Sequence, residues 1–108
     1  MVRELIGDFV DTLVPPGDGV VLKYRFSRDA KVYKLYHYVS SICDVAVLNS
    51  GTQVFPVGGK LRVYNVFLVI DLPEPLEFNS GEELQIYYSN TSGGNVRVVA
   101  GFTGCYKT

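Results

Sequence analysis

The segment from residue 81 to residue 102 constrains the fold more than any other part of the chain, because apolar and polar side chains alternate along it. Leu84, Ile86 and Tyr88 share one face of a predicted strand, and a turn rich in Asn, Ser and Gly follows. After the turn a second set shares one face, namely Val96, Val98, Ala100 and Phe102. A period of two is typical of strands with one buried face. The segment therefore predicts an antiparallel hairpin and an all-β protein.

Clusters of Gly, Pro, Asn and Ser divide the rest of the chain into pieces of strand length. They lie at residues 15–19, 27–29, 49–51, 56–59, 73–75, 79–81 and 90–94. About eight short strands at this spacing predict an antiparallel β-sandwich of jelly-roll or Greek-key type. A chain of 108 residues buries one two-layer core and is too short for a second. Residues 1–108 are therefore predicted to form a single domain.

The first predicted element fits two structures. Leu5 and Phe9 fit the apolar stripe of a helix, whereas Val10, Thr12 and Val14 alternate as they would on a strand. We predict a strand, because the sheet formed by the rest of the chain needs a partner at its edge.

Two segments are apolar on both faces. On the strand predicted for residues 31–41, one face carries Val32, Tyr36 and Tyr38 and the other carries Tyr33, Leu35 and Val39. Residues 66–70 form an uncharged run of high β propensity whose members Val66, Phe67, Leu68 and Val69 we take as candidate contact residues, together with Tyr33, Tyr36 and Tyr38. A sandwich strand normally has one wet face, so these segments predict cover by a loop or by another subunit. We favour self-association, because an open run of this kind promotes aggregation.

The charge balance argues against nucleic acid as a partner. Ten Lys and Arg stand against eleven Asp and Glu, without a basic block. Binding through phosphate neutralisation needs a concentrated positive face. No run of apolar residues is long enough for a membrane span. Residues 1–9 show no signal peptide, which predicts a cytoplasmic or virion location.

No group of residues has the composition of a catalytic or cofactor site, so we predict a protein that is not an enzyme and has no cofactor. His37 is the one histidine, and metal sites on sandwich folds need several imidazoles with a carboxylate. Neither Ser40 nor Cys43 lies in a nucleophile-elbow context. We interpret His37 as a surface or interface residue on a tyrosine-rich strand.

Eight tyrosines without a tryptophan leave two kinds of binding open. Aromatic rings on a sheet face stack on sugar rings or anchor protein contacts. Protein contact is the preferred interpretation, because sugar-binding modules commonly use tryptophan or calcium-binding loops rich in carboxylates. A carbohydrate- or ligand-binding sandwich is the alternative.

Two cysteines, Cys43 and Cys105, are too few for a disulfide framework. If the last strand returns beside the fourth, they can form a disulfide that closes a loop of about 60 residues and contributes a few kcal/mol. The other interpretation is two separate buried thiols that pack as small apolar groups.

The end of the chain resembles the last strands of small jelly-roll proteins of virus particles and phage appendages. The resemblance lies in a Gly-Glu strand opener at Gly81-Glu82, a strand that ends on Asn90 and a final strand that ends in Gly101-Phe102. The opening Val14-Pro15-Pro16-Gly17 is also similar. The resemblance implies a non-enzymatic structural module of a virion, such as a capsid, decoration or fibre protein. Such a module packs against copies of itself or against a partner protein.

Overall fold

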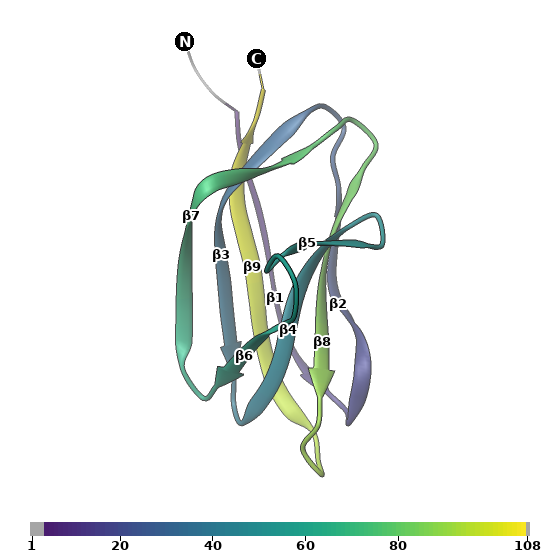
Figure 1. The fold of residues 1–108 in the computed structure, drawn as a ribbon, viewed down its shortest axis with the longest axis vertical. Coiled ribbons are helices and arrows are strands. Elements are labelled where there is room, and N and C mark those ends of the chain that lie inside the picture. Colours follow the sequence, from purple (N-terminus) through teal and green to yellow (C-terminus); the bar gives the residue numbers. More distant parts are fainter. Residues whose placement is uncertain (1–3, 108) are drawn as a thin grey trace.

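The computed structural model describes residues 4–107, which form nine strands in two antiparallel sheets (Figure 1). The strands are β1 (Leu5–Val14), β2 (Gly17–Arg25), β3 (Ala30–Val39), β4 (Ile42–Asn49), β5 (Thr52–Phe55), β6 (Leu61–Tyr64), β7 (Phe67–Phe78), β8 (Glu83–Asn90) and β9 (Val96–Tyr106). The predicted all-β sandwich is confirmed. The described residues include no helix long and apolar enough to cross a membrane.

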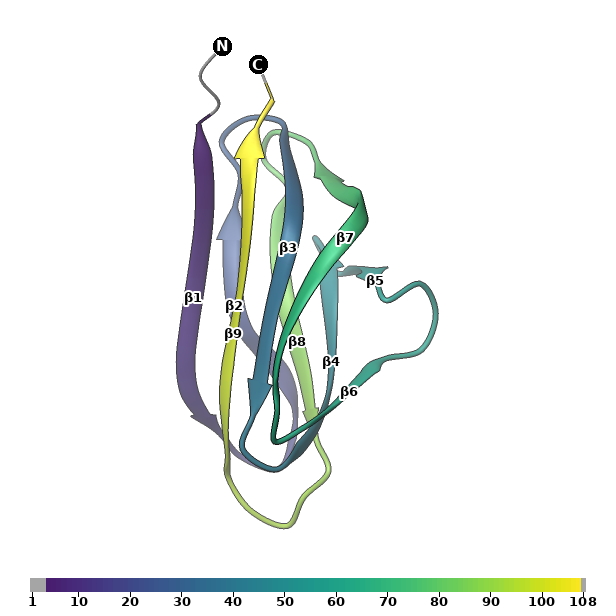
Figure 2. The ribbon, with the colours of Figure 1, turned by 90° about the vertical axis from the view of Figure 1, so that its left-hand side faces the viewer.

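The two sheets form the layers of an elongated body that measures 48 × 24 × 23 Å. Sheet A has the strand order β1-β9-β3-β7, and sheet B has the order β2-β8-β4-β5, with β6 also paired to β4. Figure 2 shows sheet A from its outer side, with β1 at one margin and β7 at the other. The chain crosses repeatedly between the sheets, which gives the sandwich its Greek-key connections.

The last two strands have the predicted faces but not the predicted pairing. Leu84, Ile86 and Tyr88 are buried on β8, and β9 also buries its predicted face. However, β8 pairs with β2 and β4 in sheet B, while β9 pairs with β1 and β3 in sheet A. The predicted hairpin is therefore wrong, because an alternating pattern identifies the buried side of a strand and not its neighbours.

Aromatic rings join the two layers near the chain termini. Phe26, which follows β2, lies with its ring centroid 4.8 Å from that of Phe78 and 5.9 Å from that of Phe102. Tyr24 packs at 5.2 Å against both Phe26 and Phe102. Phe26, Phe78 and Phe102 are almost fully buried. They come from both sheets and hold the layers together.

A bulge in β3 changes the faces that the sequence pattern predicts. The register of β3 shifts between Val32 and Lys34, so Tyr33 falls outside the aligned residue pairs that β3 forms with β7 and β9. After the bulge, Leu35 and Val39 are buried like Val32. The predicted grouping of Val32 with Tyr36 and of Tyr33 with Leu35 is therefore wrong, because one extra residue reverses the alternation.

Gly104 allows the close approach of β9 to β3 at this bulge. It pairs with Val32. A Cβ atom at residue 104 would lie 2.2 Å from the carbonyl oxygen of Lys31. Because that contact is with backbone, a side chain here would force the two strands apart.

The first segment is a strand, as predicted. β1 pairs with β9 along its whole length, from Leu5 opposite Cys105 to Val14 opposite Val96, without a register shift. β1 forms one margin of sheet A.

His37 belongs to the core, so its interpretation as a surface residue is wrong. It is 1% exposed and lies in register with Ala100 on β9 and Leu68 on β7. Its Nδ1 atom is buried without a hydrogen-bond partner. Burial lowers the pKa of His37 from 6.5 to about 4, so the imidazole is neutral at pH 7.

Candidate contact surface

The outer face of sheet A is rich in exposed apolar side chains. The sheet register aligns the residues of this face in two neighbouring rows: Phe9, Gly101, Tyr36 and Val69, and then Asp11, Val99, Tyr38 and Phe67. We call Phe9, Tyr36, Tyr38, Phe67, Val69 and Val99 the sheet A patch. Leu5 and Leu13 extend it along β1. Among the described residues, five of the nine large apolar side chains that are exposed lie on this face.

The patch is built around a glycine. The ring of Phe9 crosses Gly101, where an added Cβ would lie 2.2 Å from the Phe9 ring. On the other side of Gly101, the Phe9 ring meets Tyr36 at a centroid distance of 5.1 Å. The aromatic rings therefore cover the backbone of β9 where it lacks a side chain. Phe9 and Val69 of the first row are nevertheless 54% and 51% exposed, and Phe67 of the second row is 54% exposed, so both rows remain open to solvent.

Ion pairs border the patch on two sides. Arg97 donates two hydrogen bonds to the carboxylate of Asp11, Nε to Oδ1 at 2.8 Å and Nη2 to Oδ2 at 2.6 Å. This bidentate contact holds the pKa of Asp11 below its usual value. Toward the chain termini, Lys34 Nζ lies 3.4 Å from Asp71 Oδ1. An apolar centre with a polar border is the usual anatomy of a protein–protein interface.

An open depression of about 540 Å³ adjoins the patch near the chain termini. Its lining includes Leu5, Tyr33, Tyr36 and Thr103. Cys105 lies in it and donates from Sγ to the hydroxyl of Tyr33 at 3.7 Å. The hydroxyls of Tyr36 and Thr103 lie 3.5 Å apart. The depression thus has aromatic walls with a few polar groups.

The structure brings together most of the residues selected from the sequence. Tyr36, Tyr38, Phe67 and Val69 are members of the patch, and Tyr33 lines the adjoining depression. The hydroxyl of Tyr38 also donates to Asn65 Oδ1 at 3.2 Å.

The other two candidate contact residues lie off this face. Leu68 packs against the core from the opposite side of β7, because successive strand residues alternate in direction. Val66 is exposed in the turn before β7.

Sequence reasoning missed the contribution of β1. Leu5, Phe9 and Leu13 are all exposed and lie on the same side of the strand. Their spacing of four resembles a helical stripe, but on a strand it also places every member on one face. The assignment of this segment as a strand was therefore enough to predict that these three apolar side chains share one face.

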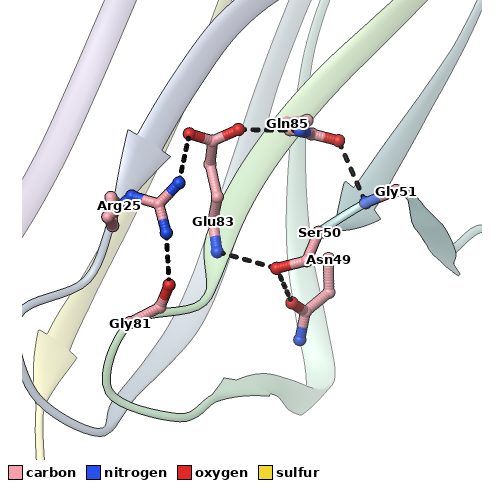
Figure 3. A network of polar contacts seen from close by, with 7 residues as sticks. All are labelled: Arg25, Asn49, Ser50, Gly51, Gly81, Glu83 and Gln85. Atoms are coloured by element: carbon pink, nitrogen blue, oxygen red, sulfur yellow. Dashed lines mark hydrogen bonds and ion pairs between the residues drawn. The ribbon is translucent and has the colours of Figure 1, made fainter.

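The outer face of sheet B differs, because its polar groups bind one another. Figure 3 shows Arg25 beside Glu83, with 3.5 Å between Nη2 and Oε2, and Arg25 Nη1 also donates to the carbonyl of Gly81 at 2.6 Å. Gln85 Nε2 donates to Glu83 Oε1 at 2.7 Å, and Gln85 Oε1 accepts from the backbone N–H of Gly51 at 3.1 Å.

This network continues to the turn after β4. The hydroxyl of Ser50 accepts from the backbone N–H of Glu83 at 3.1 Å and donates to Asn49 Oδ1 at the same distance. Farther along β4, Arg62 makes a bidentate contact with Asp44 at 2.8 and 3.2 Å. The two outer faces of the sandwich therefore differ in chemistry.

The two cysteines do not form a disulfide. Both are free thiols. The condition for a bridge, a last strand beside the fourth, is not met, since β9 lies in sheet A and β4 in sheet B. Cys43 is in the core, whereas Cys105 lines the outer depression. Burial raises the pKa of the Cys43 thiol.

Within residues 4–107, no three His, Cys, Asp or Glu side chains converge as metal ligands. His37 faces the core rather than the depression. What the outer face of sheet A offers chemically is apolar and aromatic contact area.

Comparison with known proteins finds a likeness among solved structures. No family model matches this sequence, and no curated protein matches it. A solved structure of a Bacillus endospore appendage protein, described as belonging to a novel family of disulfide-linked pili, is 11% identical to this chain. It aligns with 100% of this chain and 93% of its own chain at a TM-score of 0.48. The function of this chain is therefore inferred from its own surface.

Proposed function

We propose that this protein is a non-enzymatic structural module that associates with copies of itself through the outer face of sheet A. The observation that carries the proposal is the sheet A patch, an apolar and aromatic surface on one of two otherwise comparable sheet faces. Exposed apolar patches bordered by polar groups mark interaction sites. The self-contained polar network on sheet B leaves that face suited to solvent.

The residue types of the patch fit this role. Tyrosine and phenylalanine are enriched at the centres of protein interfaces, where a few aromatic side chains supply most of the binding energy. The ion pairs of Asp11 and Asp71 already have their partners within the chain. Association over the patch therefore buries apolar area, and each carboxylate keeps its partner within the chain.

The test is to place charge on the patch without disturbing the core. Phe67 and Val69 are about half exposed on β7, so the double substitution Phe67→Lys/Val69→Lys should change folding stability little while adding two positive charges to the contact surface. Light scattering at micromolar concentration is expected to show wild-type oligomers and a double variant of clearly lower mass.

The matched control is Val57→Lys, which adds a lysine to a loop where Val57 is 98% exposed and which lies between β5 and β6. This variant should associate as the wild type does. Equal association of the wild type, the patch variant and the control would contradict the proposed surface.

The finer proposal is that the assembly is a virion or a similar particle. If β5 and β6 are counted as one interrupted strand on the edge of β4, the sheet orders become 1-8-3-6 and 2-7-4-5. This order supports a jelly roll, a fold of viral capsid and lectin domains. The order supports the resemblance at the chain's end, while fold alone does not assign function.

The depression beside Tyr33 and Tyr36 favours a second candidate, carbohydrate binding. Aromatic walls with polar groups at their rim suit a sugar ring. Calorimetric titration with a panel of sugars decides between the candidates, since the assembly proposal expects no heat of binding from any of them.

A further inference from the structure

The edge of β1 is the most regular open edge among the described strands. β1 contains no proline, pairs only with β9, and keeps one register through all ten residues. The opposite edge, β7, contains Pro73 and Pro75 and is interrupted by the bulge. In sheet B, β2 has a register shift, and β5 and β6 have four residues each. Figure 2 shows β1 along the margin of sheet A.

The hydrogen bonds identify which residues of β1 face the open edge. The carbonyl of Glu4 accepts from the N–H of Tyr106, so even-numbered residues bond to β9. The N–H of Phe9 donates instead to the Asp8 carboxylate at 2.9 Å, and the carbonyl of Leu13 accepts from the Thr12 hydroxyl at 3.4 Å. Odd-numbered residues from 5 to 13 therefore direct their backbone groups away from β9.

Side chains leave this edge accessible. Phe9 leans across Gly101 onto Tyr36, away from the open edge. Its edge-facing N–H donates to the carboxylate of its neighbour Asp8, a solvent-exposed group that a partner strand can displace. A long, regular and apolar edge of this kind is a template for a further strand.

We propose that β1 pairs antiparallel with β1 of a second copy, around a two-fold axis at Phe9. This inference rests on the proposed self-association and adds a contact at the edge of sheet A to the contact over its outer face. Odd residues must face odd residues, because only they direct their backbone groups toward the open edge. Opposing residue numbers that add to 18 use all five odd positions, with Leu5 facing Leu13, Gly7 facing Asp11, and Phe9 facing Phe9.

This register is also the best match of side chains. Leucine faces leucine at both ends, and Asp11, already bound to Arg97, faces a glycine. A shift by two residues would place Asp11 opposite Leu5 or Phe9 and shorten the ladder. Like charges do not face each other directly in the proposed register, and a self-complementary pattern is what a two-fold contact requires.

Pairing at this edge makes the two sheet A patches continuous. The combined sheet has the order β7-β3-β9-β1-β1-β9-β3-β7, with Phe9 of each copy beside the seam. A single strand pair buries less than the ~1,600 Å² of a typical specific interface. The continuous apolar face therefore supplies further contact area in the larger assembly.

Disulfide trapping tests the register. Leu5→Cys and Leu13→Cys are made as separate proteins in a Cys43→Ala/Cys105→Ala background, and one of them carries a mass tag. Cys105 lies opposite residue 5 on β9, so its replacement prevents an intrachain disulfide with the new cysteine. Residues 5 and 13 of two copies would have Cα atoms ~5.5 Å apart, within the range of a disulfide. The two residues 5 would lie eight positions, or roughly 27 Å, apart.

Oxidation of the mixture is expected to shift the mass to that of a tagged–untagged heterodimer, while each variant alone stays at its monomer mass. Two results would overturn the β1 pairing and leave the proposed function standing. One is a yield of crosslinked homodimers equal to that of heterodimers, and the other is no crosslink in a sample that light scattering shows to be associated. A monomeric sample at every concentration would overturn both. The background protein must match the wild type in circular dichroism and oligomeric mass before the cysteines are added.

Discussion

Replacing Phe26 by alanine is expected to lower the free energy of unfolding by about 3–5 kcal/mol, the range for a buried aromatic ring. Phe26 is 0% exposed and touches rings from both sheets. Its backbone N–H also donates to Glu82, and its carbonyl accepts from Gly81. Loss of the ring leaves a cavity between the layers that these anchored neighbours cannot fill. Urea unfolding measures the change.

Val57→Ala is the control for this prediction, because Val57 is 98% exposed and its truncation should leave the midpoint nearly unchanged. A loss below about 1 kcal/mol for Phe26→Ala would mean that the rings around residue 26 do not hold the two sheets together.

The second large effect is a loss of stability in mild acid that depends on His37. Its pKa is 6.5 in the unfolded chain and about 4 in the folded protein. As the pH falls from about 6.5 to 4, the unfolded chain gains a proton while the folded protein does not, so stability decreases over that window. At about 1.4 kcal/mol for each pKa unit, the loss amounts to about 3 kcal/mol.

The substitution His37→Leu separates this effect from other titrations. It removes the titrating group and the buried Nδ1 without a partner, and it keeps a similar volume. Hydrogen bonds to Arg97 and Arg62 lower the pKa of Asp11 and Asp44 from 3.8, so these carboxylates act below the histidine window. Chemical unfolding at pH 7, 5.5 and 4 should show a decline in the wild type that the variant lacks. Equal declines would contradict a buried neutral histidine.

The sequence was sufficient to predict which side of most strands is buried. The period of two predicted for β8 and β9 is found in the structure. These patterns arise from burial, which each residue reports by its own polarity. Pairing between strands depends on contacts between residues that are distant in sequence. The prediction therefore paired β8 with β9, although the two strands lie in different sheets.

Local irregularities also escaped prediction. The bulge at Tyr33 adds one residue without a composition signal, and it turned His37 from the expected surface into the core. The candidate surface was partly predictable, since Tyr36, Phe67 and Val69 carried the signal of apolar residues on a second face. The contribution of Phe9 required knowledge that β1 lies beside Gly101.

The outer face of sheet A is proposed to serve as a contact between copies. Its most direct test is sedimentation equilibrium of the unmodified protein over a range of micromolar concentrations. The expected result is a mass that is a multiple of the 12.0 kDa chain and that falls toward one chain on dilution. A mass of one chain at every concentration would contradict the claim.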